Sequence, residues 1–239
     1  EAIRDPSSAR RAARWARERL GLGADPIDSL MSVCERLGQL VAVVETPGEG
    51  ASLVDGDLAV AVISKQSDPG RRRTTAAHEL GHLITGDEYS TDLGVHASRS
   101  DREATVNAFA AELLLPIEAI RTAARSDGTV RREDLVGLAA RFRTSWSLTV
   151  NQAVAAGTLD KRAAMDMRKR NPTRAELMEA VGWAPQPDLE TVRVPPSFAH
   201  AVMESFNKSL ITADRAVELM RGQITASDLP EHDDTDLEP

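Results

Sequence analysis

The sequence predicts an α+β fold in which a small β-sheet is followed by a predominantly helical C-terminal half. Hydrophobic residues make up 41% of the chain and aromatic residues only 3%, so Leu, Val, Ile and Ala must build the core. That composition favours helices. Short Val- and Ala-rich segments separated by glycine turns occur between residues 39 and 64. After residue 70, helical patterns follow one another, which completes the α+β order.

The chain begins with two predicted helices, at about 6–20 and 26–37. Asp5-Pro6 and Asp25-Pro26 open them, because each pairs an N-cap residue with a proline suited to the first helical turn. We expect the first helix to expose a solvated face that carries three arginines at helical spacing: Arg10, Arg14 and Arg17.

The sheet and the two helices after it come next along the chain. Alternating Val- and Ala-rich runs predict strands at 39–46, 51–55 and 57–64. A helix is predicted at 71–85, where Gly86 is a natural stop. A polar loop over 86–99 then leads to a helix at 101–115, which Pro116 ends.

The rest of the chain divides into helical segments and a tail. We expect helices at 117–125, 131–142, 146–156, 159–169, 197–207 and 213–221. The predicted organisation is a metal-binding domain over 1–127, a helix-turn-helix-like module over 128–175, a C-terminal helical segment over 176–225 and a disordered acidic tail over 226–239.

Charge, hydropathy and cysteine content limit the function classes. Six of the acidic residues lie in the last dozen positions. Without them the net charge changes from −8 to −2, so the acidity is a property of the tail and not of the whole protein. No apolar run reaches the roughly 18 residues that cross a bilayer, and no signal-peptide pattern is present. We therefore expect a cytoplasmic protein. Cys34 is the one cysteine, in an apolar helical stretch, which predicts a buried thiol and excludes a thiolate metal cluster.

The segment His78-Glu79-Leu80-Gly81-His82 carries the strongest chemical signal in the sequence. Residues four apart on a helix share one face, so the two imidazoles can hold one cation. Glu79 lies beside them and can accept a proton from water that the metal activates, as general base. Gly81 leaves the helix slim, so another element can approach closely. Zinc suits this ligand set best, and Mn²⁺ or Fe²⁺ can use the same ligands.

Glu103 is the expected third protein ligand. Ser100-Asp101-Arg102-Glu103 also fits a capping box, in which Glu103 would only reach back to the backbone. We favour the ligand role because Glu103 lies on a mostly apolar face of the helix, where a carboxylate requires a partner. Asp101, Thr105 and Glu112 are expected on the solvent side of the same helix.

Three further residues are candidates for supporting roles. Asn107 lies one turn after Glu103 and is expected to orient it. His96 and Tyr89 lie in the loop between the two helices, where either could stabilise a developing oxyanion or replace Glu103 as ligand. Loop residues of these types are more often simple surface groups.

Together with HELGH at 78–82, the pattern from Glu103 to Pro116 resembles the ImmA/IrrE metallopeptidase family. The matching residues are Glu103, Asn107, Phe109, Ala110, Ala111, Leu113, Leu114 and Pro116, in the pattern E-x-x-x-N-x-F-A-A-x-L-L-x-P. The resemblance implies a zincin-like active-site helix, with His78, His82 and Glu103 as metal ligands and Glu79 as general base. It also implies a substrate, because members of this family typically cleave a helix-turn-helix repressor and so release stress or mobile-element genes.

Two rival functions remain open. Residues 131–156 fit two helices joined at Thr144-Ser145, and residues 129–170 carry a net charge of +5, so a DNA-binding helix-turn-helix is an alternative. The second helix, where base-reading residues belong, offers no Arg or Lys, which favours packing or protein docking. The other alternative is a regulatory module whose metal site is not used for hydrolysis, which the presence of Glu79 disfavours.

Overall fold

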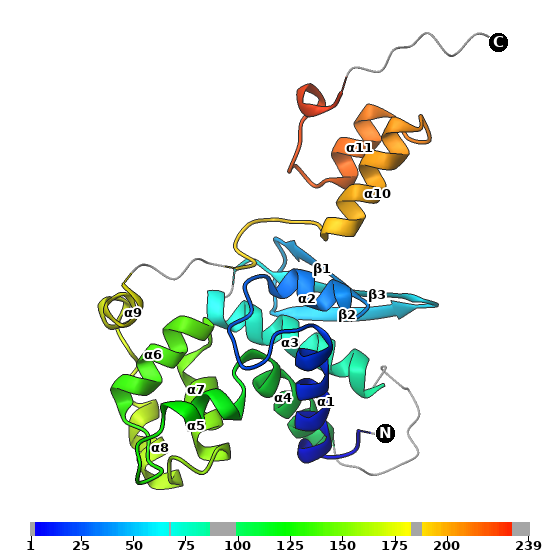
Figure 1. Ribbon diagram of the computed structural model, residues 1–239. Helices are drawn as coiled ribbons and strands as arrows, with labels where there is room; N and C mark the ends of the chain where they lie inside the picture. Colours follow the sequence, from blue (N-terminus) through cyan, green and yellow to red (C-terminus); the bar gives the residue numbers. More distant parts are fainter. Residues whose placement is uncertain (1–2, 67, 87–98, 183–187, 231–239) are drawn as a thin grey trace, which may run out of the picture.

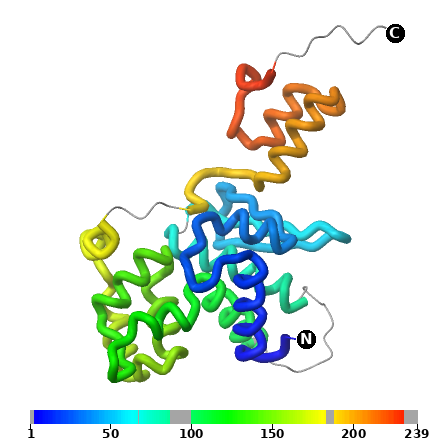
Figure 2. The backbone as a smooth tube through the Cα atoms, viewed as in Figure 1, coloured from blue at the N-terminus to red at the C-terminus, as the bar shows by residue number. Residues whose placement is uncertain are grey.

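The structure is a computed structural model that describes residues 3–66, 68–86, 99–182 and 188–230, and it confirms the predicted α+β fold (Figures 1 and 2). The three-stranded sheet lies against helix α3, with α4 and α1 on the far side of α3 (Figure 1). Helices α5 to α9 gather to one side of this layer. A hairpin of α10 and α11 stands apart, above the sheet.

The two N-terminal helices differ in how well the sequence predicts their start. Helix α1 (Pro6–Arg19) begins as expected, because the Asp5 side chain accepts hydrogen bonds from the backbone N–H groups of Ser7 and Ser8. Helix α2 (Leu30–Arg36) starts later than the Asp25-Pro26 pair predicts, with Ser29 as its N-cap. The backbone just before α2 is not helical. Its carbonyl oxygens at residues 25 and 27 accept hydrogen bonds from arginines elsewhere in the fold, in place of helical N–H groups.

The sheet has the strand order β1-β3-β2, with β1 (Gln39–Val44) parallel to β3 (Leu58–Ser64) and β2 (Gly50–Asp55) antiparallel to β3. Alternate residues of β1 and β3 point to the face covered by α3 and are buried in the main core, as period-two alternation requires. These are Val41, Val43, Ala61 and Ile63, and Ala59 is buried on the same face.

Helices α3 (Pro69–Thr85) and α4 (Arg99–Leu114) pack closely where Gly81 lies. A Cβ atom at Gly81 would lie 2.9 Å from Cγ1 of Val106 and 3.4 Å from Cδ1 of Phe109. The structure thus confirms the close approach predicted at Gly81, and the approaching element is α4. Gly86, in the left-handed conformation at φ 66°, ends α3 as predicted.

The helical module consists of α5 (Ile117–Ala123), α6 (Arg132–Phe142), α7 (Trp146–Ala155), α8 (Lys161–Arg168) and α9 (Arg174–Val181). Its core is continuous with that of the sheet and α3, since one cluster of buried side chains extends from Ala9 to Leu189. The analysis above did not predict α9. Thr173 and Glu176 form a capping box at its start, which is the sequence signal that could have revealed it.

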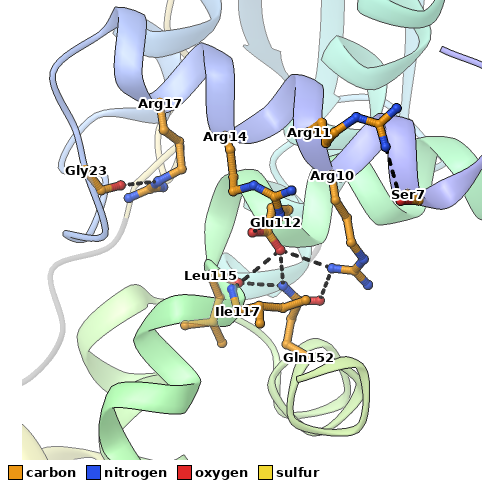
Figure 3. A network of polar contacts seen from close by, with 10 residues as sticks. All are labelled: Ser7, Arg10, Arg11, Arg14, Arg17, Gly23, Glu112, Leu115, Ile117 and Gln152. Atoms are coloured by element: carbon orange, nitrogen blue, oxygen red, sulfur yellow. Dashed lines mark hydrogen bonds and ion pairs between the residues drawn. The ribbon is translucent and has the colours of Figure 1, made fainter. Parts of the chain in front are cut away.

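Two of the three arginines of α1, Arg10 and Arg17, are not solvated as predicted, whereas Arg14 is exposed, and Thr105 and Glu112 do not lie on the solvent side of α4. Glu112 is only 1% exposed, and its carboxylate pairs with Arg10 at 3.1 Å and Arg14 at 3.3 Å (Figure 3). Arg10 also donates to Oε1 of Gln152 on α7 at 2.8 Å. Arg17 is 2% exposed and donates to backbone carbonyl oxygens, and burial lowers its pKa to about 10. The predictions failed for Arg10, Arg17 and Glu112 because each of these charged groups finds a partner on another element.

The C-terminal part contains α10 (Pro196–Asn207), α11 (Ala213–Leu219) and a 3₁₀ turn (Ala226–Asp228). The helices share a small core of their own. Arg193 joins this part to the sheet through two backbone hydrogen bonds with Val43, at the edge of β1. The 3₁₀ turn occupies the beginning of the expected disordered tail, and residues 231–239 lie outside the described part of the chain. None of the described helices has the length and hydropathy that crossing a membrane requires.

Candidate metal centre

His78 and His82 lie on one face of α3, one helical turn apart. Their Nε2 atoms are 3.1 Å apart, and their ring planes are nearly perpendicular, at 80°. Both side chains are partly buried. Leu80, Ala76 and Ala77 on the opposite side of α3 are fully buried in the core, which fixes the rotation of the helix and so the direction of the imidazoles.

Glu103 lies on α4, opposite the two histidines. Its Oε2 atom is 3.5 Å from Nε2 of His78, and ligand atoms of His78, His82 and Glu103 all lie within 4.8 Å of one another. Helix α4 begins at Arg99, so Ser100 is already helical and is not the N-cap that the capping-box alternative requires. The structure therefore brings together the three side chains that the sequence nominates.

This donor set fits a zinc ion. A tetrahedral ion with bonds of about 2.0–2.1 Å separates its ligand atoms by about 3.3 Å, close to the 3.1 and 3.5 Å observed here. Two imidazoles and one carboxylate leave a fourth position for water or substrate, as catalytic zinc sites do. Because all three ligand atoms lie within 4.8 Å of one another, side-chain adjustment alone would bring them onto one such ion.

Asn107 holds one of the histidines in place. Nδ1 of His78 donates to Oδ1 of Asn107 at 3.0 Å, so the proton of the neutral ring is on Nδ1 and the Nε2 lone pair faces the other ligand atoms. A hydrogen bond of this kind orients a metal-ligating histidine and raises its basicity. The sequence predicts a supporting role for Asn107 toward Glu103, whereas the contact that the structure shows is with His78.

Glu79 is buried beside the histidines, at 7% exposure, and is held by two strands of the sheet. Ser52 on β2 donates its hydroxyl to Oε2 of Glu79 at 2.5 Å. Gln39 on β1 donates to the backbone carbonyl oxygen of Glu79 at 3.1 Å. Sequence reasoning missed both partners, because nothing local to β1 or β2 indicates that their side chains reach α3.

The histidine–carboxylate group opens into a cleft of about 980 Å³. His78, Glu79 and Asn107 line one part of this cleft, and the opposite side is formed by the helical module. A peptide reaching the histidines would therefore touch both parts of the molecule.

Helix α7, the second helix of the helix-turn-helix-like pair, is largely buried. Trp146, Leu148, Thr149, Val150, Gln152 and Ala153 are buried in it, and Ser147, Asn151 and Ala155 are exposed. Base-reading helices present several side chains to the groove of DNA. His96 and Tyr89, the other candidates from the sequence, lie outside the described residues.

Comparison with known families supports the resemblance on which the sequence analysis relied. A peptidase family model, described as the IrrE N-terminal-like domain, matches residues 34–152. The match begins in α2, ends in α7 and includes the sheet, α3 and α4. A comparison with curated proteins found no match. Through residues 34–152, the chain belongs to the ImmA/IrrE family of metallopeptidases.

Proposed function

We propose that this protein is a zinc-dependent endopeptidase in which His78, His82 and Glu103 bind the metal and Glu79 is the general base. The convergence of these three ligand atoms within 4.8 Å, with a buried carboxylate adjacent on the same helix, is the observation that carries the proposal. A purely structural metal site has no use for that carboxylate.

The chain's own residues account for the movement of protons. When bound, the metal would supply a Lewis acid that polarises the scissile carbonyl and lowers the pKa of water. Because Ser52 occupies Oε2 of Glu79, Oε1 is the oxygen that accepts a proton from the attacking water. Glu79 then returns that proton to the leaving nitrogen. The peptide C–N bond breaks, the carbonyl carbon gains a hydroxyl group and the nitrogen gains a hydrogen atom.

The proposed substrate is a helix-turn-helix transcriptional repressor, whose cleavage would release the genes that it silences. Membership of the ImmA/IrrE family supports this choice. Such a substrate is bound to DNA in the cytoplasm, so we place the enzyme there. Nothing in the metal centre selects one peptide sequence, and a repressor encoded beside the gene of this protein is the first substrate to test.

Replacing Glu79 with Gln tests the proposed chemistry. Glu79→Gln keeps the size of the side chain and its capacity to accept the Ser52 hydroxyl, but it cannot accept a proton from water at neutral pH. We expect the variant to bind as much zinc as the wild type and to lose cleavage of a co-expressed repressor, assayed by immunoblot. Cleavage at the wild-type rate by Glu79→Gln would refute the general-base assignment.

A further inference from the structure

The cleft that reaches the candidate metal centre at His78 continues away from it along α3. Gly70, Thr74, Thr75 and His78 line it, and their spacing of three and four residues places them on one face of the helix. With a rise of about 1.5 Å per residue, Gly70 lies about 12 Å from His78 along the helix axis. An extended peptide advances about 3.3 Å per residue, so the cleft accommodates about four residues beyond the scissile bond.

The helical module closes the far end of this cleft. A Cβ atom at Gly70 would lie 3.0 Å from the backbone nitrogen of Ser145, so α3 and the turn between α6 and α7 meet there main chain to main chain. Beside this contact, four apolar side chains line the cleft, and they come from α6, α7, the segment before α9, and α9 itself. They are Ala139, Trp146, Pro172 and Leu177.

Trp146 and the helix that carries Leu177 are held by a defined set of contacts. Nε1 of Trp146 donates to the backbone carbonyl oxygen of Met167 at 2.8 Å. The Arg132 guanidinium lies 5.7 Å from the centre of the Trp146 ring and pairs with Glu176 on α9 at 2.5 Å. The helix that carries Leu177 is therefore fixed against α6 and α7, and the apolar wall is formed before any ligand binds.

At this end of the cleft, contacts with apolar side chains are the main interaction that distinguishes one substrate from another. Glu49 and Arg71 line the cleft and form an ion pair with each other, so their charges offset, and Asp68 at the start of α3 adds one negative charge to the lining. Four uncharged polar residues also line the cleft and can bind a peptide backbone: Thr74, Thr144, Ser147 and Asn171.

We propose that Ala139, Trp146, Pro172 and Leu177 form a subsite for an apolar side chain of the substrate, three to five residues from the scissile bond. The helical module then provides the side chains that select the substrate of the peptidase. This inference rests on the proposed peptidase function, because its occupant is a peptide that also reaches His78 and Glu79 through the same cleft.

Binding of a random decapeptide library to the zinc-loaded, full-length Glu79→Gln protein tests the subsite without cleavage. We expect retained peptides to be enriched in Leu, Ile, Val, Phe or Met. In the Leu177→Lys background this enrichment should fall about tenfold and shift toward Asp and Glu. Met178→Lys is the matched control, because Met178 is an exposed neighbour on α9 that does not line the cleft. Equal enrichment in the two lysine variants, or none in the parent, would overturn the subsite.

Two additional measurements separate the possible failures. Leu177→Ala, a milder change, should shift the preference toward larger apolar side chains, and it replaces the lysine variant if circular dichroism shows that Leu177→Lys does not fold. Mass spectrometry of the library digested by the wild type should place an apolar residue three to five positions from each cleaved bond. Cleavage without that preference would refute the proposed subsite but not the peptidase function. Selective binding without any cleavage would refute the peptidase function but not the apolar binding site.

Discussion

Ser52 shows how a single hydroxyl group can prepare the proposed base. It donates to one oxygen of a buried carboxylate, which helps to orient the Glu79 side chain and leaves the other oxygen for the proton in the proposed mechanism. Hydrogen bonds to charged groups contribute about 1.5–3 kcal/mol. The serine lies on the antiparallel edge strand of the sheet, which is far from the HELGH motif in the sequence. This strand therefore influences the orientation of a side chain in the motif.

Ser52→Ala should lower kcat at least about tenfold, with little change in KM, because Glu79 loses its fixed orientation while the cleft keeps its shape. Steady-state kinetics on a cleaved repressor would measure both constants. Ser52→Thr keeps a hydroxyl group and should restore most of kcat. A threonine variant as slow as the alanine variant would argue that Ser52 has only a packing role.

The sequence predicts which candidate ligands come together better than it predicts the residues that support them. His78, His82 and Glu103 could be found because helical periodicity fixes which side chains share a face, and the structure brings their ligand atoms together. The partner of Glu79 and the burial of Glu112 could not be found, because both depend on which strand or helix lies opposite. Local patterns carry no information about that pairing.

At the scale of elements, the distance between α3 and α4 decides whether Glu103 reaches the histidines. Gly81 permits that distance. Gly81→Ala should destabilise the fold by about 1–3 kcal/mol, because its new methyl group would lie 2.9 Å from Cγ1 of Val106. Gly137→Ala on α6 is the control, since a Cβ there meets nothing within 4 Å, and it should stabilise by up to about 1 kcal/mol. Urea denaturation distinguishes the two, and equal effects would contradict the close packing described here.

The attachment of α9 should depend on pH. The hydrogen bond from Arg132, followed by those from Thr173, lowers the pKa of Glu176 from 4.5 to about 2. A lowered folded-state pKa means that the contribution is fully present above about pH 4.5 and disappears as the pH falls toward 2. At pH 7, Glu176→Gln should therefore melt below the wild type, and the two melting temperatures should converge between pH 4.5 and 2. Glu179→Gln, on the exposed side of α9, should melt like the wild type, and a Glu176→Gln deficit that persists at pH 2 would exclude the ion pair as its cause.

At the scale of the whole molecule, one buried network joins the N-terminal helix to both halves of the site. Glu112 lies on the helix that carries Glu103, and it connects α1 through Arg10 and Arg14 to α7 through Gln152 (Figure 3). The metal-binding elements and the helical module share one core as well as one cleft. This arrangement holds the helical module in place as one wall of the cleft, as the proposed subsite requires.

The central claim is that His78, His82 and Glu103 together hold one catalytic metal ion. The most direct test is the zinc content of purified protein after dialysis against zinc and then buffer, measured by mass spectrometry of the metal. We expect about one zinc per chain in the wild type and in Glu79→Gln, and far less in His82→Ala and Glu103→Ala. Full zinc content in both ligand variants, or none in the folded wild type, would contradict the account.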